Sequence, residues 1–119
     1  MRLPWICAAV IGLLALTSCG KPEGADGYTI EQGVEMIEPR PIVVRTYPSY
    51  AALKAAYAAQ PGAKRKLGEG EQLFAFAVIG KACTIHQIRP TVAYRPEEFG
   101  HELTHCLYGN FHPGRDEQG

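Results

Sequence analysis

The stretch Pro96–His112 reads PEEFGHELTHCLYGNFH and contains the strongest local signals in the chain. Pro96 suits the first turn of a helix, and the carboxylates of Glu97 and Glu98 suit the positive end of the helix dipole. Gly109 can adopt the left-handed conformation that often follows the last residue of a helix. We therefore predict a helix that begins at Pro96 and ends just before Gly109.

This helix is expected to have one apolar and one polar side. At 100° per residue, the apolar side chains gather on one side, at Phe99, Leu103, Cys106 and Leu107. His101 and His105 fall on nearly the opposite side, one turn apart, with Tyr108 and Glu98 near them. The apolar side can pack on a core while the two imidazoles face a cleft. The alternative is a pair of surface histidines on an amphipathic helix.

Going back toward the N-terminus from this helix, the residues predict two strands, then a helix, and then a further strand. Leu73–Ile79 is a continuous apolar run, and Ala82–Ile88 follows it after a short turn and is expected at the edge of the sheet. Tyr50–Gln60 has a helical apolar stripe, and Ile42–Tyr47 is rich in β-branched residues. The order strand, helix, strand, strand, helix predicts an α+β domain with two helices and a small, mostly antiparallel sheet.

The first residues indicate a bacterial lipoprotein precursor. Arg2 precedes an uncharged apolar run, residues 3–16, that is shorter than the about 20 residues of a membrane-spanning helix. Leu16-Thr17-Ser18-Cys19 resembles the lipobox of bacterial lipoproteins, which implies that Cys19 carries the lipid, palmitate among its acyl chains. Gly20, by the same resemblance, favours the outer membrane, facing the periplasm. The alternative is an ordinary signal peptide with a chance cysteine near its cleavage site.

These signals divide the 119 residues into three parts. We expect a signal peptide at 1–18, a lipidated N-terminus and flexible tether at 19–41, and one folded domain at 42–119. Removing Arg2 leaves one more acidic than basic residue in the mature chain, so the charge balance indicates no nucleic-acid partner. The expected membrane contact is the lipid anchor.

The four cysteines have different expected fates. Cys7 leaves with the signal peptide and Cys19 takes the lipid, so Cys83 and Cys106 remain in an oxidising compartment. A disulfide between them would join the last helix to the preceding strand. The alternative is two buried free thiols.

The helix residues His101, Glu102 and His105 form the arrangement H-E-x-x-H, in which two imidazoles can reach one metal ion. Glu102 is placed to take a proton from water at the metal. A third ligand is needed, and His112 is favoured because the turn at Gly109 would bring it back toward the helix. The other candidates are Asp116, Glu117 and His86.

With Gly109 and His112, this arrangement resembles the zincin metallopeptidases, and most closely their metzincin branch. The resemblance implies a minimal zincin-like core, one Zn²⁺ held by the three histidines, and Glu102 as the general base that activates the zinc-bound water for peptide hydrolysis. The segment between the second and third histidine is one residue longer than in the metzincin pattern.

The expected partner is therefore a peptide or protein substrate in the bacterial envelope. We expect the peptide to lie along the free edge of strand Ala82–Ile88, with Tyr108 or His86 in contact with it or with the oxyanion. Proteins, peptides and cell-wall peptide cross-links all remain open as substrates. One rival hypothesis is a non-enzymatic lipoprotein that binds a metal or a partner on the same scaffold. Another is an envelope interaction protein without metal.

Overall fold

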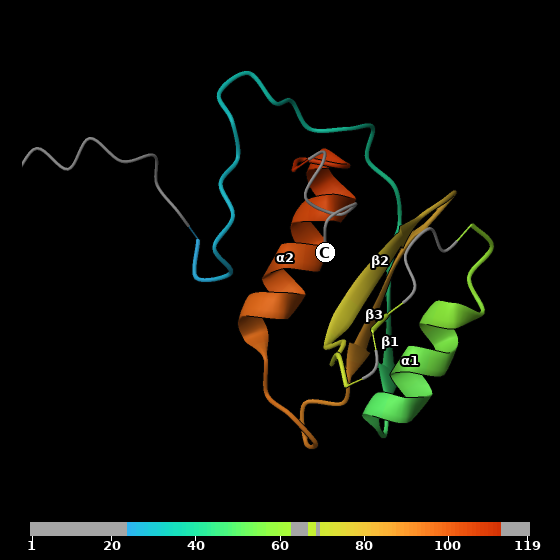
Figure 1. The fold of residues 1–119 in the computed structure, drawn as a ribbon. Coiled ribbons are helices and arrows are strands. Elements are labelled where there is room, and N and C mark those ends of the chain that lie inside the picture. Colours follow the sequence, from blue (N-terminus) through green and yellow to red (C-terminus); the bar gives the residue numbers. More distant parts are fainter. Residues whose placement is uncertain (1–23, 63–66, 69, 113–119) are drawn as a thin grey trace, which may run out of the picture.

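The chain folds in the predicted order of elements, as a computed structural model that describes residues 24–62, 67–68 and 70–112 shows (Figure 1). The elements are β1 Ile42–Tyr47, α1 Tyr50–Ala58, β2 Ala75–Ile79, β3 Cys83–Ile88 and α2 Pro96–Tyr108. The predicted α+β class is confirmed. The signal peptide 1–18, Cys19, Asp116 and Glu117 lie outside the described residues. Among those described, no helix combines the length and apolar character needed to cross a membrane.

The sheet is mixed, with the strand order β1-β3-β2. β3 pairs with β1 in parallel, from Ile42 opposite Cys83 to Tyr47 opposite Ile88, and with β2 antiparallel. The prediction of a mostly antiparallel sheet with 82–88 at its edge was therefore wrong. The chain passes from β1 through α1 into β2, which runs antiparallel to β1 at the opposite edge of the sheet. The β2–β3 hairpin then brings β3 back between them, parallel to β1.

The two helices cover opposite faces of this sheet (Figure 1). On the α1 face, Leu53 is fully buried against Phe76 and Ile88. Ser49 caps α1, its Oγ accepting a hydrogen bond of 3.1 Å from the amide of Ala52. Because helices cover both faces, the central strand β3 buries residues of both its faces.

On the α2 face, the core is built around a disulfide. Cys83 of β3 and Cys106 of α2 are bonded, with Cα atoms 5.6 Å apart. Ile85 is fully buried beside them, and Phe99 and Leu103 of α2 pack against the cluster. The predicted bridge is confirmed, and it fastens α2 directly to the central strand.

Candidate metal centre

The helix α2 begins and ends where the local signals predicted. Pro96 lies in its first turn, and Gly109 follows its last residue with φ +70°, a conformation that favours glycine. The amide of Gly109 donates to the carbonyl of His105 at 2.8 Å. The chain then turns back, and Phe111 and His112 become buried beside the helix.

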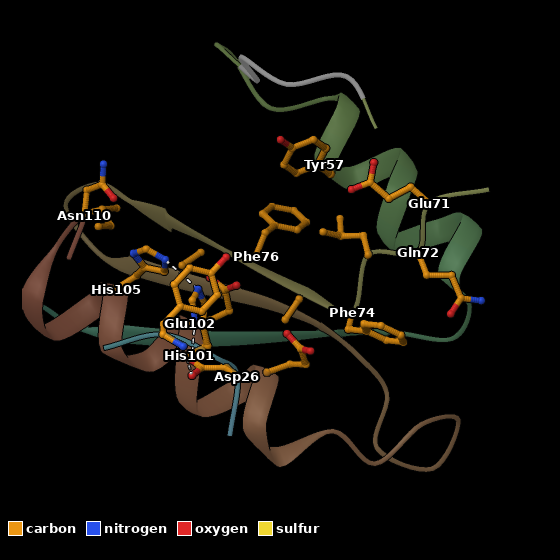
Figure 2. Close-up of a pocket in the computed structure, with 16 residues that line it drawn as sticks. Asp26, Tyr57, Glu71, Gln72, Phe74, Phe76, His101, Glu102, His105 and Asn110 are labelled. Carbon is orange, nitrogen blue, oxygen red and sulfur yellow. Dashed lines mark hydrogen bonds and ion pairs between the residues drawn. The ribbon is translucent and has the colours of Figure 1, made fainter. Parts of the chain in front are cut away.

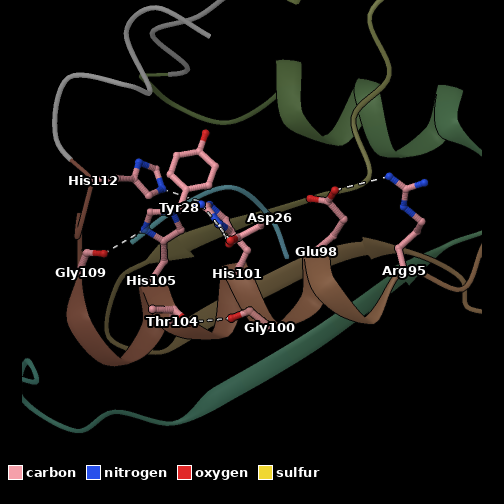
Figure 3. A network of polar contacts seen from close by, with 10 residues as sticks. All are labelled: Asp26, Tyr28, Arg95, Glu98, Gly100, His101, Thr104, His105, Gly109 and His112. Carbon is pink, nitrogen blue, oxygen red and sulfur yellow. Dashed lines mark hydrogen bonds and ion pairs between the residues drawn. The ribbon is translucent and has the colours of Figure 1, made fainter. Parts of the chain in front are cut away.

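Three imidazoles meet at this reversal (Figure 3). The Nε2 atom of His101 lies 3.2 Å from Nε2 of His105 and 3.0 Å from Nε2 of His112. One ligand nitrogen from each residue lies within 4.8 Å of the other two. Nitrogens bound tetrahedrally to zinc at about 2.0–2.1 Å are roughly 3.3–3.4 Å apart. The spacing of the three rings therefore suits one metal ion, as the sequence predicted for these histidines.

The other ring nitrogen of two histidines is held by an oxygen. Nδ1 of His101 lies 2.7 Å from Oδ2 of Asp26, and Nδ1 of His105 lies 2.9 Å from the carbonyl oxygen of Gly109. A carboxylate and a carbonyl can only accept, so in both rings Nδ1 carries the hydrogen. In its neutral form, a ring held in this way presents a lone pair at Nε2, and this is the form that binds metals.

The carboxylate of Asp26 is stabilised by these contacts. Burial alone would raise the pKa of Asp26, but hydrogen bonds from His101 and from the amide of Tyr28 outweigh burial and hold the pKa below its usual value. Asp26 is therefore ionised where it meets the imidazole of His101, and it can polarise that ring.

His101 and His105 open onto a pocket of about 590 Å³ (Figure 2). His101 and His105 line one side, and Tyr57 of α1 lies across from them. Residues 71–77, which include most of β2, line the pocket between them. Within the described residues, no strand pairs with the outer edge of β2. The pocket therefore crosses a free strand edge beside the three imidazoles.

Glu102 lies in the same pocket as His101 and His105 (Figure 2). It is largely buried, with 9% of its surface exposed. Its place directly after His101 turns its side chain about 100° around the helix from that ligand. A carboxylate in this position can exchange a proton with a group bound in the pocket.

His86 lies elsewhere. It is buried in the α1 face of the sheet, stacked on Phe76 with ring centroids 4.3 Å apart, and its Nδ1 is 2.7 Å from the hydroxyl of Tyr47. It is absent from the lining of the pocket and from the group of three imidazoles. The structure thus places it as a core residue, away from both roles that the sequence suggested. Tyr108, at the end of α2, is also absent from the pocket lining.

The buried His86 predicts a loss of stability in mild acid. Burial, and then the nearby charge of Arg45, hold the pKa of His86 below its ordinary value of 6.5. As the pH falls through 6.5, the unfolded chain takes up a proton that the folded chain does not, so the free energy of unfolding decreases. We expect denaturant titrations between pH 7.5 and 5.5 to show this decrease, by at most about 1.4 kcal/mol per pH unit for this residue. A His86→Gln variant should have a shallower slope; an equal slope would contradict the assignment.

Two residues beside the three imidazoles, Asp26 and Tyr28, were not predicted from the sequence. The ring centroid of Tyr28 lies 4.7 Å from that of His101 and 4.3 Å from that of His112. Both residues belong to the stretch predicted as a tether. Its Gly- and Glu-rich composition is typical of a flexible segment, so no role at the site was expected for them. The only local signal is Asp26-Gly27, a pair that favours a tight turn.

Comparisons with known protein families, with curated proteins and with solved structures gave no significant match to this chain.

Proposed function

We propose that this chain is a zinc-dependent metallopeptidase on a zincin-like scaffold. The observation that carries the proposal is the contact between His101 and His105. With hydrogens on both Nδ1 atoms, two Nε2 lone pairs face each other at 3.2 Å. Two neutral rings in this arrangement repel each other, and either a proton on one ring or a metal ion bound by both nitrogens removes the repulsion. His112 favours the metal ion, because it adds a third nitrogen at 3.0 Å from His101. Zinc is favoured because it accepts an all-imidazole ligand set and leaves a position for water.

Glu102 is the proposed general base. A divalent ion bound to the three imidazoles would polarise a substrate carbonyl and make a neighbouring water more acidic. Glu102 accepts the proton of the attacking water in the pocket and returns it to the leaving amine. Its low exposure keeps bulk water from competing for the carboxylate.

The free edge of β2 is the proposed substrate platform, in place of strand 82–88. A peptide in extended form can add to this edge through backbone hydrogen bonds, and the pocket that crosses the edge leads to His101 and His105. Strand 82–88 cannot serve because both its edges are already paired. The substrate class, a peptide or protein segment, follows from this mode of binding.

The proposed location is the bacterial envelope, with the chain lipidated at Cys19 and facing the periplasm from the outer membrane. The support is the lipobox-like Leu16-Thr17-Ser18-Cys19 and the Cys83–Cys106 bridge, since disulfides persist in oxidising compartments. The rival function is a metal-binding or partner-binding lipoprotein without catalysis.

One experiment separates these functions. The full-length chain, purified in detergent, is analysed for metal and then incubated with a mixed peptide library. We expect close to one zinc per chain and cleavage that stops with a chelator and returns when zinc is added. Zinc without cleavage of any peptide would support the non-enzymatic rival. A chain that binds no divalent metal would overturn both metal-based functions.

A further inference from the structure

We propose that the segment Gly24–Ile37, which precedes the folded domain, completes the metal centre. In this proposal, which rests on metal binding at the proposed site, Asp26 is a positioning residue that aims His101 at the ion. Tyr28 closes one side of the three imidazoles. The metal affinity of α2 would then depend on a segment about 75 residues upstream of it.

Asp26 is held in place by a turn of its own segment. Its Oδ1 accepts a hydrogen bond of 3.1 Å from the amide of Tyr28, which leaves Oδ2 to meet His101. The turn is closed by the amide of Gly24 donating to the carbonyl of Tyr28 at 2.9 Å, and Gly27 has φ +79°. Both oxygens of the carboxylate are thus engaged, and the contact with His101 is directional.

Among the three histidines, His101 is the one whose orientation depends most on the segment Gly24–Ile37. Its Nε2 is within 3.2 Å of the corresponding atom of each of the other two histidines. His105 takes its orientation from Gly109, at the end of its own helix. The orientation of His101, in contrast, depends on a carboxylate from another segment (Figure 3). A carboxylate on the far nitrogen of a ligating histidine fixes its tautomer and ring orientation and raises its basicity.

Tyr28 covers the same cluster. Its ring packs against His101 and His112, and it also lines a second pocket of about 360 Å³ with Phe111 and His112. An aromatic ring in this place limits the access of water to the imidazoles from that side. Tyr28 therefore separates the two pockets at the metal centre.

The far end of the segment is fixed to the same helix. The amide of Ile37 donates to the carbonyl of Leu107 at 2.8 Å, and a side chain at Gly109 would meet Cγ2 of Ile37 at 3.4 Å. The segment is therefore attached to α2 at two points, His101 and Leu107, about two turns apart. Its docking supports both the ligand and the helix end that leads to His112.

The test is the zinc affinity of the full-length chain in detergent, measured by competition with a chromophoric chelator. We expect Asp26→Asn to raise the zinc Kd by about 10- to 100-fold, the usual effect of losing such a partner. The absorption spectrum of the Co²⁺-loaded chain should change as well, because the ring of His101 is held less firmly. The melting temperature of the metal-free chain reports any general loss of folding separately.

Glu35→Gln is the matched control. It removes one carboxylate from the same segment at an exposed position, and its zinc Kd should stay within about twofold of the wild type. A wild-type Kd and Co²⁺ spectrum for Asp26→Asn would overturn the proposal while leaving the proposed function intact. A wild-type chain that binds no zinc would instead overturn the proposed function, and this inference with it.

Discussion

Glu102→Gln is expected to reduce peptide hydrolysis by about 10²- to 10⁴-fold while the chain keeps its metal. Glutamine has nearly the same size and can still accept a hydrogen bond, but its amide cannot take a proton from water. The side chain is 9% exposed and lies in the pocket beside His101 and His105, so the substitution should change the chemistry without changing the ligand set. The measurements are kcat for a cleaved library peptide and zinc per chain.

Glu97→Gln is the control for this experiment. It removes a carboxylate from the first turn of the same helix, where Glu97 pairs with Arg95 at 3.3 Å and does not line the pocket. Its kcat should remain near that of the wild type. If Glu102→Gln kept full activity, Glu102 would have no place in the mechanism.

His112→Ala is expected to abolish stoichiometric zinc binding. The variant leaves two imidazoles, and the loss of a direct ligand should exceed the roughly 100-fold upper range for an outer partner. His112 is 8% exposed and contacts His101, and the one further described histidine, His86, lies outside the group of three imidazoles. Zinc per chain after dialysis and the Kd from chelator competition give the result.

Asn110→Ala is the matched variant, because it alters the same turn at an exposed side chain. It should keep zinc near one per chain. Wild-type affinity in His112→Ala would mean that the third ligand is supplied elsewhere, and Asp116→Ala and Glu117→Ala would then be the variants to examine.

The parts of the site that local sequence controls could be predicted. Pro96 and Gly109 set the two ends of α2, the four-residue spacing sets His101 and His105 on one side, and the turn at Gly109 returns His112. Each of these depends on neighbours within a few residues, for which backbone preferences are strong.

The features of the fold and of the site that depend on partners far away in the sequence could not be predicted. Strand 82–88 was expected at the edge of the sheet, yet β3 is central, and its polar His86 lies in the core with its Nδ1 2.7 Å from the hydroxyl of Tyr47. Asp26 looked like part of a tether because its partner, His101, is 75 residues away. Strand order and contacts such as that between Asp26 and His101 are determined by tertiary packing. The composition of a segment does not indicate which distant residues will pack against it.

If Cys19 carries a lipid, as we propose, the contact between Asp26 and His101 would also limit where the protein can work. Only seven positions separate Asp26 from Cys19. Fully extended, seven residues cover at most about 25 Å. With an acyl chain on Cys19, catalysis would therefore be confined to a thin layer at the bilayer surface. Segments of other envelope proteins that lie close to the membrane would be within reach, and targets deeper in the periplasm would not.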